Sequence, residues 1–451
     1  MSNTSISYIL LIVGLIIYFI RPRWVVLYYI SLEPIFLPVI ALKQGVINQD
    51  GMTEIRSIID SGLAIRLFVV VFVIELFSKY KTIKWSRFQS LLVALLFLCI
   101  YLISFYSFHT FTSQLFYSDI RNAILTILPL LLFTINRQLI PHSKQLKTYI
   151  FLLVLYQFLW CMLELTDTMH PYLAHYFDDT TYYDGLGEKV SLVCGTFYRY
   201  NGMANYLTTI FLALSIDFFY YRRISILFYS TVALLILGMV FISGAKISVV
   251  LLFYILIGVC MLNYKKYRLL LFSLVGIIIS TYIFLLSFSS YLSDLSGLSG
   301  LNRTIEQMAN YVQSDSKNDQ STVSHSTFLI DNYFDNPLFG NCYSYKGDRA
   351  YWKLRDLQTV KADSRLAYTL VEYGLIGFLI YMFFFLSAIK YAVEESANKK
   401  IIVLVFLYFF LLTISEGGFF EFRIVFLYYI CAYGGCNLNC ICQTKKLLAY
   451  G

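Results

Sequence analysis

Charge is what this sequence of 451 residues has least of. Asp, Glu, Lys and Arg make up 14% of it, while hydrophobic residues reach 59%. Soluble domains carry about 25% charged and about 45–50% apolar residues. So much apolar surface cannot be hidden inside one water-soluble globule. The composition therefore excludes a soluble enzyme, a nucleic-acid-binding protein and a disordered scaffold, and we assign the net charge of +8 to membrane topology.

Two common kinds of catalytic motif are also missing. None of the five His residues stands in the HExxH pattern of zinc hydrolases, and no Walker or GxGxxG loop for nucleotides occurs. Three thiols cluster near the C-terminus, at Cys436, Cys440 and Cys442. Zinc sites usually have four ligands, so acylation beside the membrane is the better interpretation of this cluster. We therefore expect neither a metal nor a cofactor.

Long apolar runs, in contrast, recur along the whole chain. A helix of about 20 apolar residues can cross a bilayer and satisfies its own backbone groups there, whereas membrane strands alternate over about ten residues. We therefore predict an all-α integral membrane protein with 12–13 transmembrane helices. The runs lie at about 5–20, 24–42, 62–78, 88–106, 122–136, 149–165, 200–219, 225–242, 247–263, 269–289, 366–390, 401–414 and 419–435.

The positions of Lys and Arg predict the orientation of these helices. More than half of the 35 Lys and Arg residues lie in alternate connectors, and the positive-inside rule assigns those connectors to the cytoplasm. The N-terminus is then outside and the C-terminus inside. The predicted order is a helical region at 1–289 with an outer loop at 166–199, a large outer loop at 290–365, the last helices at 366–435 and a cytoplasmic tail at 436–451.

The large outer loop at 290–365 is polar, rich in Ser, Asp and Tyr, and is expected to be partly helical. Long loops on a rigid helical scaffold often carry chemistry or form a lid, although a passive connection is the alternative. No internal repeat matches the two halves of the chain. Many transporters have such matched halves, so their absence here disfavours a transporter.

Four cations lie at outer helix ends, where the positive-inside rule disfavours them: Arg121, Arg199, Lys246 and Arg365. Charged groups at membrane depth are expensive and usually serve a function. Arg grips phosphate with a planar fork and Lys with a point charge, so the set fits an anionic lipid headgroup. The alternative is that each pairs with a local carboxylate or extends its charge to the interface.

One part of the sequence is more specific. It runs NPLFGN at Asn336–Asn341 and then DSRLAYTLVEYGLIGFLIY at Asp363–Tyr381. A turn, a plain helix cap at Asp363 and glycines for close helix packing would explain these pieces singly, but not their joint order and spacing. They resemble the loop signature of the bacterial O-antigen ligase and polysaccharide repeat-unit polymerase (Wzy-type) superfamily.

In the resemblance, Arg303 matches an Arg of the large loop, and Asp363 and Glu372 match the start of the last motif. RYNGMANYL at Arg199–Leu207 is similar to a family stretch that enters a span, and SGAK at Ser243–Lys246 is similar to a Thr-Gly-Ser-Arg turn. Ligases of the superfamily carry His where Asp363 stands, so the resemblance favours a polymerase.

The resemblance implies a GT-C-like, metal-independent glycosyltransferase in the bacterial cytoplasmic (inner) membrane, with its active site facing the periplasm. Donor and acceptor would both be glycans on undecaprenyl diphosphate, and a chain-length regulator is a candidate partner. The product would be O-antigen, capsule or exopolysaccharide. The alternatives are a ligase that transfers polymer to lipid A-core or protein, and a flippase for the lipid-linked glycan.

The implied site divides into two groups of residues. The expected catalytic residues are Asp363 as first base, Glu372 as second base, and Arg303. A carboxylate near the acceptor hydroxyl takes its proton, and fixed cations stabilise the diphosphate leaving group. The residues expected to bind diphosphate or substrate are Arg199, Lys246, Arg121, Arg365 and Asn205.

Overall fold

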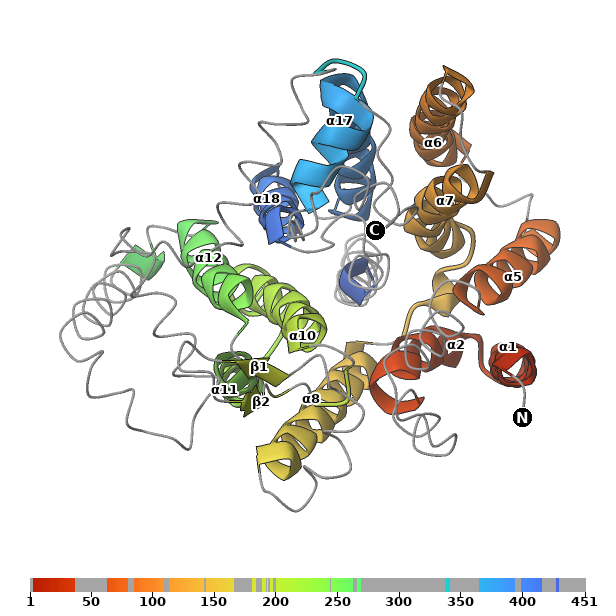
Figure 1. Ribbon diagram of the computed structural model, residues 1–451. Coiled ribbons are helices and arrows are strands. Elements are labelled where there is room, and N and C mark those ends of the chain that lie inside the picture. The colour runs from red at the N-terminus through yellow and green to blue at the C-terminus, as the bar shows by residue number, and fades with distance from the viewer. Residues whose placement is uncertain are drawn as a thin grey trace, which may run out of the picture. The chain divides into compact units, whose positions relative to one another are not determined.

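The computed structural model describes most of the apolar helices of the chain (Figure 1). The residues it describes are 3–36, 63–79, 85–108, 113–141, 143–165, 181–183, 189–191, 193, 195–197, 200–243, 245–262, 266–268, 337–340, 365–393, 399–415 and 427–429. Within this part the chain is almost entirely helical.

The helices coincide with eleven of the thirteen predicted spans. They are α1 (Asn3–Ile20), α2 (Pro22–Ser31) with the π-turn η1 (Leu32–Phe36), α5 (Leu63–Lys79), α6 (Trp85–Phe108), α7 (Ser113–Ile135), the 3-10 turn η4 (Arg137–Leu139), α8 (Ser143–Leu165), α10 (Tyr200–Ser215) with the π-turn η6 (Ile216–Tyr220), α11 (Ile226–Ser243), α12 (Lys246–Leu262), α17 (Arg365–Val393) and α18 (Lys399–Ser415). The runs at 269–289 and 419–435 lie outside the described residues, apart from 427–429.

Four of the described helical segments are long and apolar enough to cross a membrane: Lys144–Leu163, Asn201–Tyr220, Ile226–Ser243 and Tyr373–Lys390. Many large apolar side chains on the helices are exposed, such as Phe77 at 77% and Leu234 at 69%. Such a surface is unfavourable in water and suits a lipid environment. The structure is thus consistent with an all-α membrane protein.

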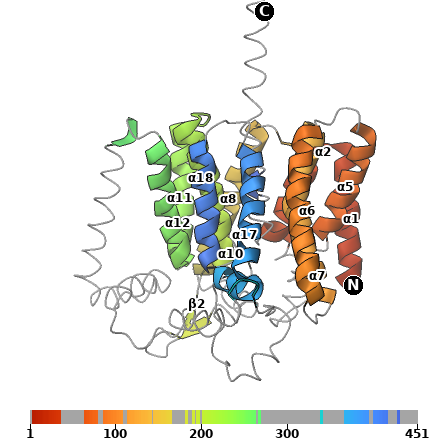
Figure 2. The same cartoon turned by 90° about the horizontal axis from the view of Figure 1, so that it is seen from above.

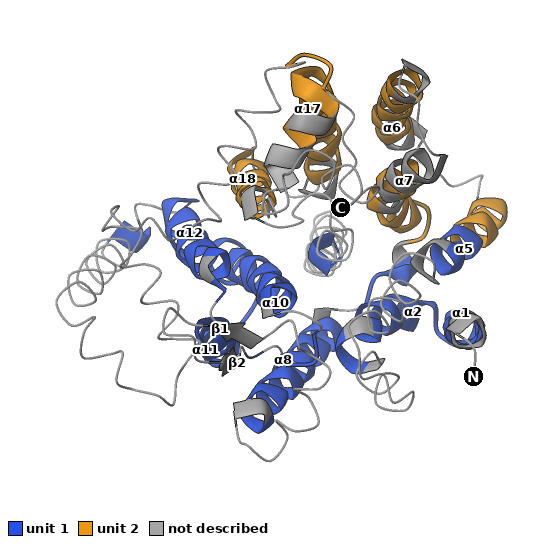
Figure 3. Cartoon of the chain, viewed as in Figure 1, with its two compact units in different colours: residues 1–71, 138–314, 427–451 blue, residues 72–137, 315–426 orange. Residues whose placement is uncertain are grey.

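The chain forms two compact units (Figure 3). Unit 1 comprises residues 1–71, 138–314 and 427–451. Its most buried helix is α10, which packs against α11 and α12 (Figures 1 and 2). The hydroxyl of Tyr206 on α10 also donates to the carbonyl oxygen of Ile30 on α2, at 3.2 Å. Helix α10 is therefore the central support of this unit.

Unit 2 comprises residues 72–137 and 315–426. Helix α17 packs against α6, α7 and α18, and α6 also packs against α7. The fully buried side chains of this unit are large and apolar, among them Phe133, Phe384 and Phe409. Their packing fixes α17, the helix that carries most of the loop signature.

Three features differ from the sequence-based expectations. The short span expected at 122–136 is part of a longer helix of 23 residues, α7, which starts at Ser113. The apolar run did not mark its first turns, because they contain polar residues such as Gln114 and Asp119. The single span expected at 366–390 is broken at Gly374. The loop at 166–199, which the charge pattern predicts to lie outside, contains an antiparallel hairpin of β1 (Thr181–Tyr183) and β2 (Lys189–Ser191). These are two short strands among described residues that are otherwise almost entirely helical.

Candidate active site

The NPLFG turn and the break in α17 bind each other through their backbones. The N–H of Leu375 donates to the carbonyl oxygen of Pro337 at 2.9 Å, and the N–H of Ile376 donates to that of Leu338 at 3.1 Å. Breaking a helix leaves its next N–H groups without intrahelical acceptors. The turn supplies those acceptors, so two segments that lie 34 residues or more apart in the sequence form one element.

Gly374 is the residue that permits this contact. Its backbone has φ 66° and ψ −175°, a region that is essentially open to glycine alone. A Cβ atom here would collide with backbone atoms of Leu338 and Gly340. The sequence-based alternative of a glycine for helix packing is thus incomplete, because Gly374 also sets the path of the chain.

Tyr101 of α6 holds the other side of the break. Its hydroxyl donates to the carbonyl oxygen of Tyr373 at 2.8 Å. The Tyr373 side chain is only 1% exposed, and its ring packs against Phe105 of α6 and Tyr381 of α17. A Cβ atom on Gly377 would collide with the Tyr101 hydroxyl. The break is therefore held by hydrogen bonds to the residues before and after Gly374 and by the aromatic packing of Tyr373.

The break divides α17 into a first segment at 365–373 and the long apolar segment that follows. Arg365 begins the first segment, and Glu372 lies two residues before Gly374. Their backbone positions belong to the described structure, while their side chains, together with Asp363 and Arg303, lie outside it. The element formed by turn and break thus fixes the backbone beside Glu372.

Arg121 lies on α7 in the same unit and is half-buried. Its Nε is fully buried and has no hydrogen-bond partner among the residues that the structure describes. A buried charged donor without an acceptor is costly. The structure places Arg121 inside α7, which begins at Ser113, and not at the helix end that the sequence analysis expected. Its buried Nε makes it a candidate to bind an anionic ligand.

In unit 1, Asn205 of the RYNGMANYL stretch contacts Ser248, which lies two residues after the SGAK stretch. The Ser248 hydroxyl on α12 donates to Oδ1 of Asn205 on α10 at 3.0 Å, and both residues are buried. The Nδ2 group of Asn205 has no partner within the described part of the chain. Lys246 begins α12 two residues ahead of Ser248, so α10 and the start of α12 form one polar junction. The Lys246 side chain lies outside the description.

A buried glutamine positions the chain that leads into α10. Gln157 of α8 donates from Nε2 to the Thr196 hydroxyl and accepts the Thr196 N–H at 3.2 Å. Gly195 has φ 59°, and a Cβ atom there would lie 2.8 Å from Oε1 of Gln157. This contact fixes the backbone three residues before Arg199, which itself lies outside the described residues.

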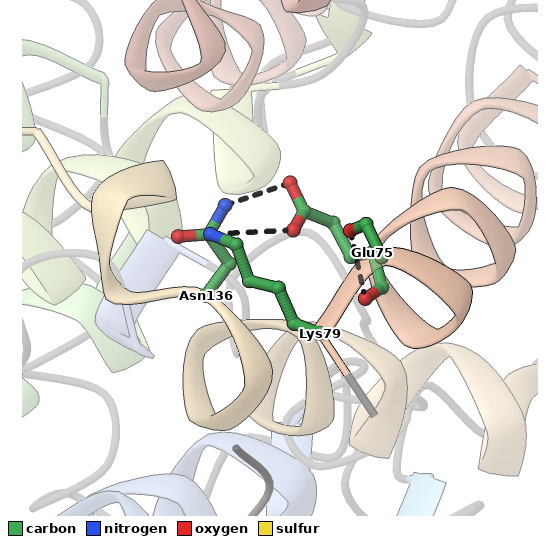
Figure 4. Close-up of polar contacts among 4 residues, drawn as sticks. Glu75, Lys79 and Asn136 are labelled. Atoms are coloured by element: carbon green, nitrogen blue, oxygen red, sulfur yellow. Dashed lines mark hydrogen bonds and ion pairs between the residues drawn. The ribbon is translucent and has the colours of Figure 1, made fainter. Parts of the chain in front are cut away.

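A second buried polar cluster connects α5 with the end of α7 (Figure 4). Nδ2 of Asn136 donates to Oε1 of Glu75 at 2.7 Å, and Nζ of Lys79 lies 3.6 Å from Oε2 of the same carboxylate. Glu75 is 3% exposed. The cluster gives one oxygen of a buried carboxylate a hydrogen bond and the other an ion pair. It lies on the side that the charge pattern assigns to the cytoplasm.

Sequence reasoning missed the side chains that support the expected site, namely Gln157, Ser248 and Tyr101. None of them belongs to a motif, and a single polar residue in an apolar run carries no signal of its partner. The expected site residues themselves divide between the units. Arg199, Lys246, Asn205 and Arg303 belong to unit 1, and Arg121, Asp363, Arg365 and Glu372 belong to unit 2.

Two further findings concern metal ligands and similarity to known proteins. Within the described part of the chain, no group of three or more His, Cys, Asp or Glu residues is arranged to hold a metal ion. No protein-family model matches the sequence, and no curated protein matches it. The function is therefore inferred from the residues and their arrangement.

Proposed function

We propose that this protein is a polymerase that joins undecaprenyl-diphosphate-linked oligosaccharide repeat units on the outer face of the bacterial cytoplasmic membrane. The observation that carries the proposal is the contact between the NPLFG turn and the Gly374 break. These are the two parts of the loop signature whose joint order and spacing no simple structural role explains. Their backbone bonding in one element supports a shared role.

The junction between α10 and α12 gives further support. It joins the RYNGMANYL stretch, through Asn205, to Ser248, two residues after the SGAK stretch. These two stretches carry the other part of the resemblance. The amide Nδ2 of Asn205 and the Nε of Arg121 are buried donors without partners in the described structure. Such donors are suited to the oxygens of a diphosphate.

In the proposed reaction, a sugar hydroxyl of the acceptor attacks the anomeric carbon of the donor glycan. A glycosidic bond forms, the bond to the lipid diphosphate breaks, and the bonding electrons leave with the diphosphate. Asp363 takes the hydroxyl proton, with Glu372 as the second candidate base. By the resemblance, fixed cations stabilise the charge on the leaving diphosphate, and the chemistry needs no metal or cofactor.

The test is deletion of the gene in its host, followed by complementation with wild type, Asp363→Asn, Arg121→Gln and Asn205→Leu. Lys390→Gln is the matched control, because it removes an exposed cation from the far end of α17. Surface polysaccharide is resolved on a gel, lipid-linked intermediates are identified by mass, and membrane insertion is checked by immunoblot.

We expect the deletion and the three site variants to leave single repeat units, while Lys390→Gln restores full-length polymer. Polymer that accumulates on undecaprenyl diphosphate without transfer would identify a ligase instead. Repeat units trapped on the cytoplasmic side would refute the enzyme and identify a flippase. Full polymer from the site variants would refute the proposed site.

A further inference from the structure

A cluster of cations lies in unit 1 where α10 leads through η6 to α11, at the opposite end of α11 from the start of α12. The described residues here include Lys144 and Lys147 at the start of α8, Arg222 and Arg223 in the connector, and Asp217 in η6. Lys266 and Arg268 flank Tyr267, whose ring packs against Phe219 of η6 at 5.1 Å. Of these six cations, Arg223 and Lys147 lie near the described acid Asp217.

The connector holds Arg223 in a defined position. Its N–H donates to the carbonyl oxygen of Asp217 at 3.0 Å, and its own carbonyl oxygen accepts a bond from Nζ of Lys147 at 2.7 Å. The preceding Arg222 has φ 53°, an uncommon conformation for a residue other than glycine. The guanidinium lies over the ring of Tyr221, 4.1 Å from its centroid.

The guanidinium of Arg223 is buried, with its side chain only 10% exposed. Asp217 forms an ion pair with it, with Oδ1 at 3.8 Å from Nη1, a distance that is too long for a hydrogen bond. Nε and Nη1 are both fully buried and have no hydrogen-bond partner among the described residues. Burying charged donors without acceptors is costly, so the arrangement indicates an anionic ligand with several oxygens.

The surroundings indicate that this ligand is a lipid. Helix α11 begins three residues after Arg223, and its first residues, Ile226 and Leu227, are 72% and 75% exposed. Leu152, on the neighbouring helix α8, is 57% exposed. If a lipid phosphate bound at the connector, the acyl chains of that lipid would therefore lie along these exposed apolar side chains. We propose that Arg223 and Lys147 bind the phosphate of an anionic membrane lipid.

This site is separate from the proposed active site. It lies on the side that the positive charges assign to the cytoplasm, and its function would be to anchor the connector between α10 and α11. Arg223 supplies a planar fork for two phosphate oxygens. Lys147 uses one of its three N–H groups for the Arg223 carbonyl, which leaves two for the ligand. Asp217 is expected to weaken binding, because it repels the phosphate.

The experiment titrates the purified full-length protein in neutral detergent with phosphatidylglycerol, with phosphatidylcholine as the neutral lipid, and counts bound lipids by native mass spectrometry. Arg223→Gln is expected to weaken phosphatidylglycerol binding about tenfold, the effect of one charged hydrogen bond. Lys144→Gln is the matched control: it removes an exposed cation one turn from Lys147 and is expected to change binding by no more than about threefold. Asp217→Asn is expected to strengthen binding.

Two results would overturn the proposal. Equal losses for Arg223→Gln and Lys144→Gln would mean diffuse attraction to surface charge instead of a built site. Weaker binding by Asp217→Asn would mean that the carboxylate only holds Arg223 in place. A third measurement separates the source of the phosphate. Thermal stabilisation by inorganic phosphate equal to that by phosphatidylglycerol would refute a lipid ligand, whereas stabilisation by phosphatidylglycerol alone would support it.

Discussion

Replacement of Gly374 by Ala tests whether the turn and the helix break form one element. The added Cβ atom would collide with backbone atoms of Leu338 and Gly340, which cannot move away as a flexible side chain can. The backbone conformation at Gly374 is also strained for alanine. We expect the turn to separate from α17 in this variant.

The magnitude follows from the structure. The backbone conformation costs alanine about 1–3 kcal/mol. Loss of the bonds from Leu375 and Ile376 to the turn adds about 1 kcal/mol for each bond. The total of about 3–5 kcal/mol is below the stability of about 5–15 kcal/mol that is typical of a whole protein. The change should therefore release the turn locally without unfolding the helical bundle.

Hydrogen exchange read by mass spectrometry, on protein reconstituted in lipid nanodiscs, measures this release. The amides of Leu375 and Ile376 should exchange at least about 100-fold faster, because each 1.4 kcal/mol is a factor of ten. Gly238→Ala is the control: Gly238 lies within α11, and nothing stands within 4 Å of an added Cβ atom. This control should be stabilising by up to about 1 kcal/mol. Unchanged exchange in Gly374→Ala, with thermal stability equal to that of Gly238→Ala, would refute the reasoning.

Three further substitutions test the supporting contacts. Gly195→Ala should lower the free energy of unfolding by about 1–3 kcal/mol, measured by thermal unfolding, because of its positive φ and the nearby Gln157 side chain; no loss would mean that the loop adapts. Glu75→Gln should retain the bond from Asn136 and cost about 1 kcal/mol or less, whereas Glu75→Ala should cost about 1–3 kcal/mol more. Equal losses would contradict the role of that bond. Ser248→Ala should destabilise by about 1–2 kcal/mol, because a buried amide oxygen of α10 loses its donor, while Ser230→Ala, at an exposed site on α11, should have almost no effect.

The helices were predictable because their signal is local. A run of apolar residues has to be helical wherever lipid surrounds it, so eleven predicted spans coincide with helices of the structure. The same reasoning placed Lys246 at the start of α12. It placed Arg121 at a helix end, which is wrong, because α7 begins at Ser113 and Arg121 lies inside it. It did not predict the break at Gly374, because one glycine in an apolar run is equally compatible with close packing of a straight helix.

Other parts of the candidate site depend on residues far apart in the sequence. Gln157 and Thr196 are 39 positions apart, and Asn205 and Ser248 are 43 positions apart. A buried donor needs some hydrogen-bond acceptor, but the sequence does not say which one. The pairing is settled only when the helices pack.

The sequence by itself determined that this chain is a set of apolar helices, and it determined where charged residues interrupt them. It also marked the two segments of the loop signature. Only the tertiary structure decided that the NPLFG turn bonds to the break at Gly374, and that Arg223 is buried without a hydrogen bond to its nearest acid. The physical reason is that composition and periodicity act over a few neighbouring residues, whereas hydrogen-bond partners and buried charges are set by the packing of distant segments.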